Sequence, residues 1–255
     1  MSTIKDNLYF TYDGKSCKDF GLINISLDNG MFEESFGATR SIVETEVQGG
    51  DTPTLNRIDE EPLEFPLTIA FEGKFDDNLI DEVIVWLFKD YYRPLYFENN
   101  PNKIYYCMPV GEASIVHNGL KEGFITVSMR CKSSRVMSPV FTTETYDFSS
   151  GTGSLSISNE GHFEIYPELS IVKIGDGHVT ITKNGEIFEV RDLTNLEEIY
   201  IDSRKELIES DIVGVYRYDN VVGDFHDLAM DLGNNTYNIQ GSCRISFRYS
   251  FKYRF

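Results

Sequence analysis

The chain has 255 residues, of which 25% are charged and 41% hydrophobic, proportions typical of a folded globular protein with one large or two smaller domains. Its 23 basic and 41 acidic side chains give a formal net charge of −18. This charge argues against general binding to nucleic acid or to anionic membranes, because phosphate contacts need Lys and Arg. The longest apolar run, 83–88, is far shorter than the roughly 20 residues of a membrane-spanning helix.

The N-terminal residues show no apolar stretch followed by a cleavage site, so no secretory signal is visible and we expect folding in a cytoplasm. In such a reducing compartment, widely spaced cysteines are expected to be buried free thiols. One disulfide remains an alternative that the spacing does not decide. The four cysteines are Cys17, Cys107, Cys131 and Cys243.

The segment 44–64 is strongly acidic, with seven carboxylates against the single basic residue Arg57. Turn-forming residues at 49–53 lie in its middle, which predicts two strands around a long loop that projects from a compact sheet. Either the loop is simply solvated, or it is an arm that reaches a neighbouring subunit. The second interpretation makes these residues interface candidates: Glu44, Glu46, Asp51, Arg57, Asp59, Glu60 and Glu61.

Strict alternation of apolar and polar residues over 63–71 predicts a strand with one buried face. Pro66 within it predicts an edge position or a bulge, since proline has no backbone N–H to donate. Residues 76–90 follow a different period, with apolar side chains at 79, 80, 83, 84, 87 and 88. This stripe predicts an amphipathic helix that covers one face of a sheet, begins at the Asp76-Asp77-Asn78 cluster and includes Trp86.

Alternation returns over 125–131, and the Ser- and Pro-containing stretch 133–139 then predicts a boundary between domains 1–137 and 138–255. The last strand pattern, 244–254, has large apolar residues on one face and basic residues, led by Arg244 and Arg248, on the other. This basic face either pairs with local carboxylates or contacts an acidic arm of another subunit. Asp-Gly and Asn-Gly pairs predict hairpin turns at 13–14, 29–30, 118–119, 176–177 and 184–185.

The sequence contains no recognisable catalytic, metal-binding or cofactor-binding motif. The four histidines are not spaced as zinc ligands, and no nucleophile elbow, phosphate-binding loop, dinucleotide fingerprint or calcium loop is present. His226, between Asp224 and Asp227, is expected to be a hydrogen-bonded surface group. We therefore predict a protein without enzymatic activity, metal or cofactor.

The order of several short motifs along nearly the whole chain resembles that of phage distal tail proteins. Each motif is weak alone, and their order and spacing carry the resemblance. In the first half they lie at 10–16, 19–22, 61–65, 85–88 and 93–97, and in the second half at 159–161, 166–169, 199–202 and 232–235.

The resemblance implies a mainly β protein with an N-terminal β-sandwich domain, which carries helix 76–90 and a hairpin arm at about 40–64, and a C-terminal galectin-like β-sandwich. It further implies a homo-hexameric ring in the virion tail tip, assembled in the host cytoplasm. The implied partners are the tail tube protein, a tail-associated lysin-like tail-tip hub protein and receptor-binding components. DNA would pass through the ring during ejection without specific binding.

Two further hypotheses accompany this resemblance. A hexamer would carry 6 × −18 = −108 formal charges, so a lumen lined with carboxylates would repel DNA phosphates and let the duplex slide. The alternative function is a carbohydrate-binding protein that contacts host cell-surface glycans, because galectin-like sandwiches bind sugars. The 33 Phe and Tyr residues fall mostly on alternating strand faces, a pattern that favours a core over a sugar site.

Overall fold

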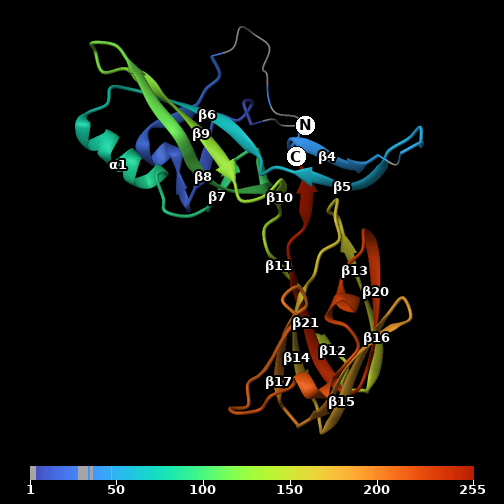
Figure 1. Ribbon diagram of the computed structural model, residues 1–255. Coiled ribbons are helices and arrows are strands. Elements are labelled where there is room, and N and C mark those ends of the chain that lie inside the picture. Colours follow the sequence, from blue (N-terminus) through green and yellow to red (C-terminus); the bar gives the residue numbers. More distant parts are fainter. Residues whose placement is uncertain (1–3, 28–33, 35–36, 47) are drawn as a thin grey trace. The chain divides into compact units, whose positions relative to one another are not determined.

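The computed structural model describes residues 4–27, 34, 37–46 and 48–255, and the fold is mainly β, as predicted (Figure 1). The chain divides into two compact units, one comprising residues 1–137 with 254–255 and the other residues 138–253. The predicted turn at 29–30 lies outside the described residues. Among those described, no helix is long and apolar enough to cross a membrane.

The first unit is built on an antiparallel sheet in the order β2-β1-β7-β8-β9-β6-β3. A short strand, β10 (Arg135–Met137), pairs with β8. The strands of the main order are β1 (Phe10–Tyr12), β2 (Lys15–Ser16), β3 (Leu22–Asn24), β6 (Glu64–Phe71), β7 (Arg93–Phe97), β8 (Asn100–His117) and β9 (Gly123–Cys131).

The strands predicted over 63–71 and 125–131 are confirmed as β6 and β9, which pair along their length. Their alternate side chains are buried as expected, for example Leu67 and Val127. β3 pairs with β6 only as far as Ile69, so no β3 residue lies opposite Pro66. Proline has no backbone N–H, and on that side of β6 no strand partner lacks a donor because of it.

The predicted helix is confirmed as α1 (Asp77–Leu87), and the Asp76 side chain caps it by accepting from the backbone N–H of Leu79 at 2.9 Å. The predicted end of the helix was wrong, and the predicted buried stripe was right only for part of its residues. The helix ends at Leu87, and it buries Val83, Trp86 and Leu87, whereas Ile84 and Phe88 are 47% and 44% exposed. The reason is Trp86, whose ring stacks on Phe20 and Phe10 at centroid distances of 4.6 and 5.7 Å. The side of the helix that carries Trp86 therefore faces the core.

The second unit is a sandwich of two antiparallel sheets that share one core, formed by residues such as Ile181 and Tyr237 from one sheet and Ile171 and Phe247 from the other. One sheet has the order β11-β21-β14-β17-β18, with β12 also beside β21, and the other the order β13-β20-β15-β16-β19. Their strands are β11 (Phe141–Thr142), β12 (Tyr146–Asp147), β13 (Thr152–Asn159), β14 (Glu168–Lys173), β15 (Gly177–Lys183), β16 (Glu186–Leu193), β17 (Glu198–Asp202), β18 (Leu207–Ser210), β19 (Val221–Val222), β20 (Gly233–Gln240) and β21 (Cys243–Tyr249).

The prediction of one continuous strand over 244–254 was wrong, because two strands share this stretch. β21 ends at Tyr249 and β22 (Lys252–Arg254) starts three residues later. Between them, Ser250 and Phe251 form hydrogen bonds with Ser138. The Ser138 hydroxyl accepts from the Phe251 N–H, and the Ser250 hydroxyl donates to the Ser138 carbonyl. The alternating pattern continues through this break because Phe251 is still buried.

Two of the predicted hairpin turns join adjacent strands directly. Asp13-Gly14 joins β1 to β2 and Asn184-Gly185 joins β15 to β16, and all four residues have positive φ. Asn118 lies instead in a five-residue loop, where its side-chain oxygen accepts from the N–H groups of Leu120 and Glu122. The prediction for 176–177 was wrong, since this pair connects β14 of one sheet to β15 of the other.

Candidate subunit interface

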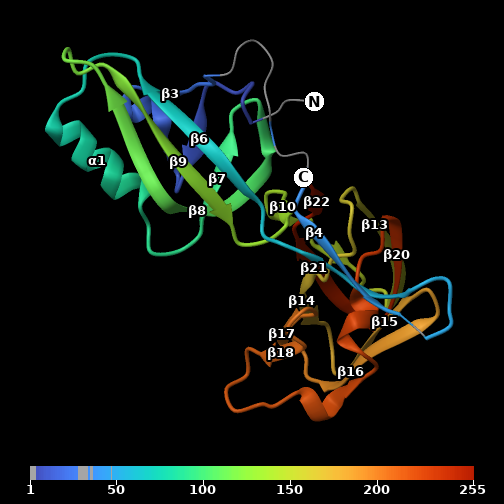
Figure 2. The ribbon, with the colours of Figure 1, turned by 45° about the horizontal axis from the view of Figure 1, so that its top comes forward.

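The predicted hairpin arm is formed by β4 (Arg40–Thr45) and β5 (Thr54–Glu60), which make a two-stranded sheet of their own (Figures 1 and 2). The strands pair in register from Arg40 opposite Glu60 to Thr45 opposite Thr54, with a bulge after Val43. All described residues from 40 to 59 are exposed except the half-buried Val43. A lone two-stranded ribbon is marginally stable in water, so this arm lacks the packing that usually maintains such a structure.

The two faces of the arm differ in chemistry. Ile42 lies directly opposite Ile58, and beyond the bulge Leu55 lies opposite Glu44 on the same side. This face therefore carries one exposed carboxylate and three large apolar side chains, Ile42, Ile58 and Leu55, which are 62%, 42% and 52% exposed. We call these three residues the apolar face of the arm. On the other face, Arg57 and Asp59 form an exposed ion pair at 3.0 Å, which contributes little to stability.

Glu60 anchors the base of the arm. Its carboxylate pairs with Arg40 at 3.2 Å, accepts from the Ser134 hydroxyl at 3.2 Å and forms an ion pair with Arg135. Burial acts to raise the pKa of Glu60, but the hydrogen bonds from Arg135 and Ser134 and the two positive charges outweigh it and hold the pKa below its usual value. Glu60 is therefore a structural carboxylate at the point where the arm leaves the sheet.

The remaining candidates from the sequence lie in two separate places. Glu44, Glu46, Asp51 and Glu61 are exposed along the arm and its loop. Arg244 and Arg248 belong to β21 in the second unit, where each meets a nearby carboxylate, Asp147 at 3.3 Å and Glu168 at 2.6 Å. This is the local pairing that was one of the two expectations for the basic face.

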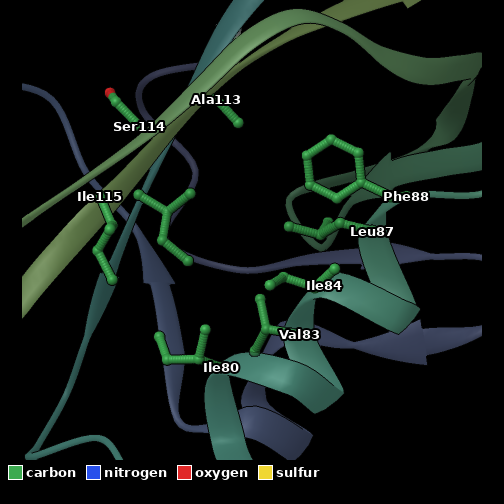
Figure 3. A pocket seen from close by; sticks show the side chains of 9 residues that line it. Ile80, Val83, Ile84, Leu87, Phe88, Ala113, Ser114 and Ile115 are labelled. Atoms are coloured by element: carbon green, nitrogen blue, oxygen red, sulfur yellow. The ribbon is translucent and has the colours of Figure 1, made fainter. Parts of the chain in front are cut away.

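A groove beside α1 is a feature that the sequence reasoning missed (Figure 3). Its volume is about 300 Å³, and eight of the nine described residues that line it are apolar, the ninth being Ser114. Ile80 and Ile84 come from the helix and Phe88 follows its last residue, while Ala113 and Ile115 come from the second half of β8. The sequence does indicate such a groove, because the helical segment has more apolar residues than one helix face can bury. These are residues 79, 80, 83, 84, 86, 87 and 88.

The described part of the chain shows no arrangement typical of a catalytic or metal centre. It contains no cluster of three or more potential metal ligands. The Asp224 carboxylate accepts a hydrogen bond from His226 Nδ1 at 2.9 Å on the surface, as expected for a hydrogen-bonded group. A buried ion pair, Arg217 with Glu197 through two contacts of 2.6 and 2.7 Å, holds the residue before β17 to the segment after β18 and so supports the sandwich.

Comparisons with known proteins agree with this fold. The family model described as "Phage tail protein N-terminal domain" matches residues 5–133. The SPbeta prophage-derived protein YomH of Bacillus subtilis (strain 168) is 31% identical over 253 residues, which cover 98% of this chain and 99% of the relative.

Two solved structures share the fold. SPP1 Dit (gp 19.1), a paradigm of the hub adsorption apparatus in phages that infect Gram-positive bacteria, aligns with a TM-score of 0.70 and 15% identity over 96% of this chain and 99% of that one. A chain of the phage P2 baseplate in its activated conformation with Ca aligns with a TM-score of 0.52 and 8% identity over 96% of this chain and 98% of that one. The resemblance noted from the sequence motifs is thus confirmed: the chain belongs to the phage tail protein family and shares the β-rich fold of SPP1 Dit.

Proposed function

We propose that this protein forms a hexameric ring that joins the tail tube to the tail-tip hub and supports receptor-binding components. Family membership and a fold shared with SPP1 Dit over 96% of the chain support this role. The observation that carries the proposal is the arm: a two-stranded ribbon with Ile42, Leu55 and Ile58 exposed needs a protein surface to cover it. A neighbouring copy supplies that surface in a ring.

In this proposal the second unit is the galectin-like sandwich, and it acts as a support. Its two sheets and single core make it a rigid support that does not depend on the arm. The exposed carboxylates of the arm and its loop, such as Glu44, Glu46 and Asp51, lie at subunit or lumen surfaces, where negative charge repels DNA phosphates. Mapping the lumen of an assembled ring tests this last point, and a lumen lined mainly by Lys and Arg contradicts it.

One observation favours carbohydrate binding as a second candidate function. Tyr216 in the second unit is 67% exposed and lies 5.1 Å from the ring of Tyr218, and exposed aromatic rings are the surfaces on which sugars stack. A glycan array tests this function directly. Binding that is lost in Tyr216→Ala supports it, and an array without signal for the intact protein removes it.

The decisive experiment for the tail role uses the tail tube protein that this proposal names as the partner. The two purified proteins are mixed, and the products are imaged by negative stain. We expect this protein to cap one end of each tube with a six-fold ring. Tubes that remain uncapped at both ends, with this protein free in solution, would contradict a role as the connector.

A further inference from the structure

Two buried cysteines lie directly opposite each other in the main sheet of the first unit. Cys107 of β8 and Cys131, the last residue of β9, are partners in the antiparallel ladder, and Figure 2 shows the two strands side by side. Their exposed fractions are 0% and 3%, and both are free thiols. Residues directly opposite in an antiparallel pair project to the same face of the sheet, so the two side chains are neighbours in the core.

The backbone hydrogen bonds show which kind of pair the two cysteines form. Lys132 donates its N–H to the Tyr106 carbonyl at 2.8 Å, so the adjacent pair of the ladder is joined by hydrogen bonds. The Cys131 N–H points the other way and donates to the Leu63 carbonyl at 2.7 Å, on the side of β6. Because hydrogen-bonded and non-hydrogen-bonded pairs alternate along an antiparallel ladder, Cys107 and Cys131 form a non-hydrogen-bonded pair.

This geometry suits a disulfide. The Cα atoms of a non-hydrogen-bonded pair are about 4.5 Å apart, and its side chains are closer than those of a hydrogen-bonded pair. A disulfide needs a Cα separation of about 4.4–6.8 Å, so the strands are already close enough for the bond. The two thiols also influence each other, since burial and, after it, the hydrogen bond and charge of the Cys131 thiol raise the pKa of Cys107 well above its usual value.

The other two cysteines have no such neighbour. Cys17 begins a 3-10 helix, and its sulfur accepts a hydrogen bond from the Phe10 N–H at 3.4 Å. Cys243 of β21 lies opposite Lys173 in the second unit. All four cysteines lie in the described part of the chain, and its ladders place only Cys107 and its partner opposite each other. The spacing in the sequence left one disulfide open as an alternative, and the fold selects a single pair for it.

We propose that Cys107 and Cys131 are a redox modification site, which closes to a disulfide when the folded protein meets hydrogen peroxide. Peroxide oxidises one thiol to a sulfenic acid while its own O–O bond breaks, and one water leaves. The second thiol attacks the sulfenic sulfur, the S–S bond forms, the S–O bond breaks, and a second water leaves with the thiol proton. Two thiols and one peroxide thus give one disulfide and two waters.

The disulfide is a covalent cross-link at the end of the sheet from which the arm leaves. It joins β8 to β9, and the hydrogen bond from Cys131 to Leu63 already joins β9 to the segment between the arm and β6. The cysteines are 131 − 107 = 24 positions apart, so the bond also restricts the unfolded chain. In a tail protein that folds in a reducing cytoplasm and functions outside the cell, the bond closes only after assembly. This timing rests on the proposed function, whereas the pairing of the thiols does not.

A thiol count after oxidation tests the pair. The reduced, folded protein is treated with hydrogen peroxide, quenched with catalase, denatured and titrated with a thiol reagent. We expect two thiols where the reduced protein has four, and a non-reducing digest in which the peptides of Cys107 and Cys131 are linked. The double variant Cys17→Ala, Cys243→Ala is the matched control, because it keeps the pair and its count should fall from two to none. Four remaining thiols, a loss of thiols without the linked peptides, or a link between any other two cysteines would overturn the proposal.

Thermal unfolding tests whether the bond stabilises the first unit. Closing a loop of this length should raise the Tm of that unit by roughly 10 °C, and a phosphine reductant should reverse the rise. Cys107→Ala and Cys131→Ala each remove one partner, so peroxide should leave the Tm of both variants unchanged. A rise below about 2 °C in the unchanged protein, or an equal rise in either variant, would contradict a stabilising cross-link.

These outcomes are independent of the role in the tail. Linked cysteines in a protein that leaves tail tubes uncapped would support the disulfide and contradict the connector. Unlinked cysteines in a protein that caps the tubes would contradict the disulfide and support the connector.

Discussion

Trp86 is the residue on which the position of α1, and with it the groove, depends most. Its ring is 2% exposed, stacks on Phe10 and Phe20, and its indole N–H donates to the Tyr12 carbonyl at 2.9 Å. A buried Trp removes roughly 150–250 Å² from water, which at about 25 cal/mol per Å² corresponds to about 4–6 kcal/mol. Measured Trp→Ala changes in cores cost about 3–5 kcal/mol. We therefore expect Trp86→Ala to lower the free energy of unfolding of the first unit by about 4 kcal/mol.

Differential scanning calorimetry measures this loss. For a unit of this size, about 4 kcal/mol lowers the Tm by roughly 10–15 °C. Hydrogen exchange locates the effect, which should fall on the first unit and leave the amides of the sandwich unchanged, because the two units have separate cores. The control is Val85→Ala on the same helix, expected within about 0.5 kcal/mol of the unchanged protein. A shift below about 2 °C for Trp86→Ala, or an equal shift for the control, would refute the packing described for α1.

Four further predictions concern the cap of α1, the second unit and the cysteines. Asp76→Ala removes the cap of α1 and should cost about 1 kcal/mol, measured by urea unfolding, whereas an equal cost for the exposed Asp81→Ala would show that the cap is not the cause. Glu197→Gln leaves Arg217 buried beside a neutral amide and should cost about 3–5 kcal/mol, and a loss below 1 kcal/mol would contradict the pair. Burial acts to raise the pKa of Glu197, but hydrogen bonds, above all from Arg217, outweigh it and lower the pKa. The stabilisation by this carboxylate is therefore present above the unfolded pKa of about 4.3 and is lost as the pH falls through the lower folded value. A Tm of the second unit that stays constant from pH 6 to pH 3 would disprove this. All four cysteines are free and buried, so a thiol reagent should modify none in the folded protein and four after denaturation, and rapid modification of the native state would be the opposite result.

Local patterns were sufficient to predict much of the first unit. The strict alternation around Leu67 and Val127 identified β6 and β9, because each of these strands buries one face. The Asp76 cluster identified the start of α1, since capping depends on residues adjacent in the sequence. The loop at 49–53 with strands on both sides identified the arm as a hairpin.

The misses share a tertiary cause. The phase of α1 depends on the aromatic pocket that receives Trp86, and Phe10 and Phe20 lie more than 60 residues away in the sequence. The groove depends on the register shift in β8 between Val110 and Ser114, near Gly111 with its positive φ, and no pattern in the sequence shows which side chains such a bulge redirects. The apolar face of the arm was overlooked because its carboxylates dominated the composition.

The hexameric ring is the central claim, and the mass of the purified protein in solution tests it most directly. Light scattering after size exclusion, with negative-stain images of the same peak, should give 6 × 29.2 kDa, about 175 kDa, or twice that for two stacked rings, with a central hole. A uniform monomer near 29 kDa at every concentration, including in the presence of the tail tube protein, would contradict the ring. That result would favour a stand-alone binding protein instead.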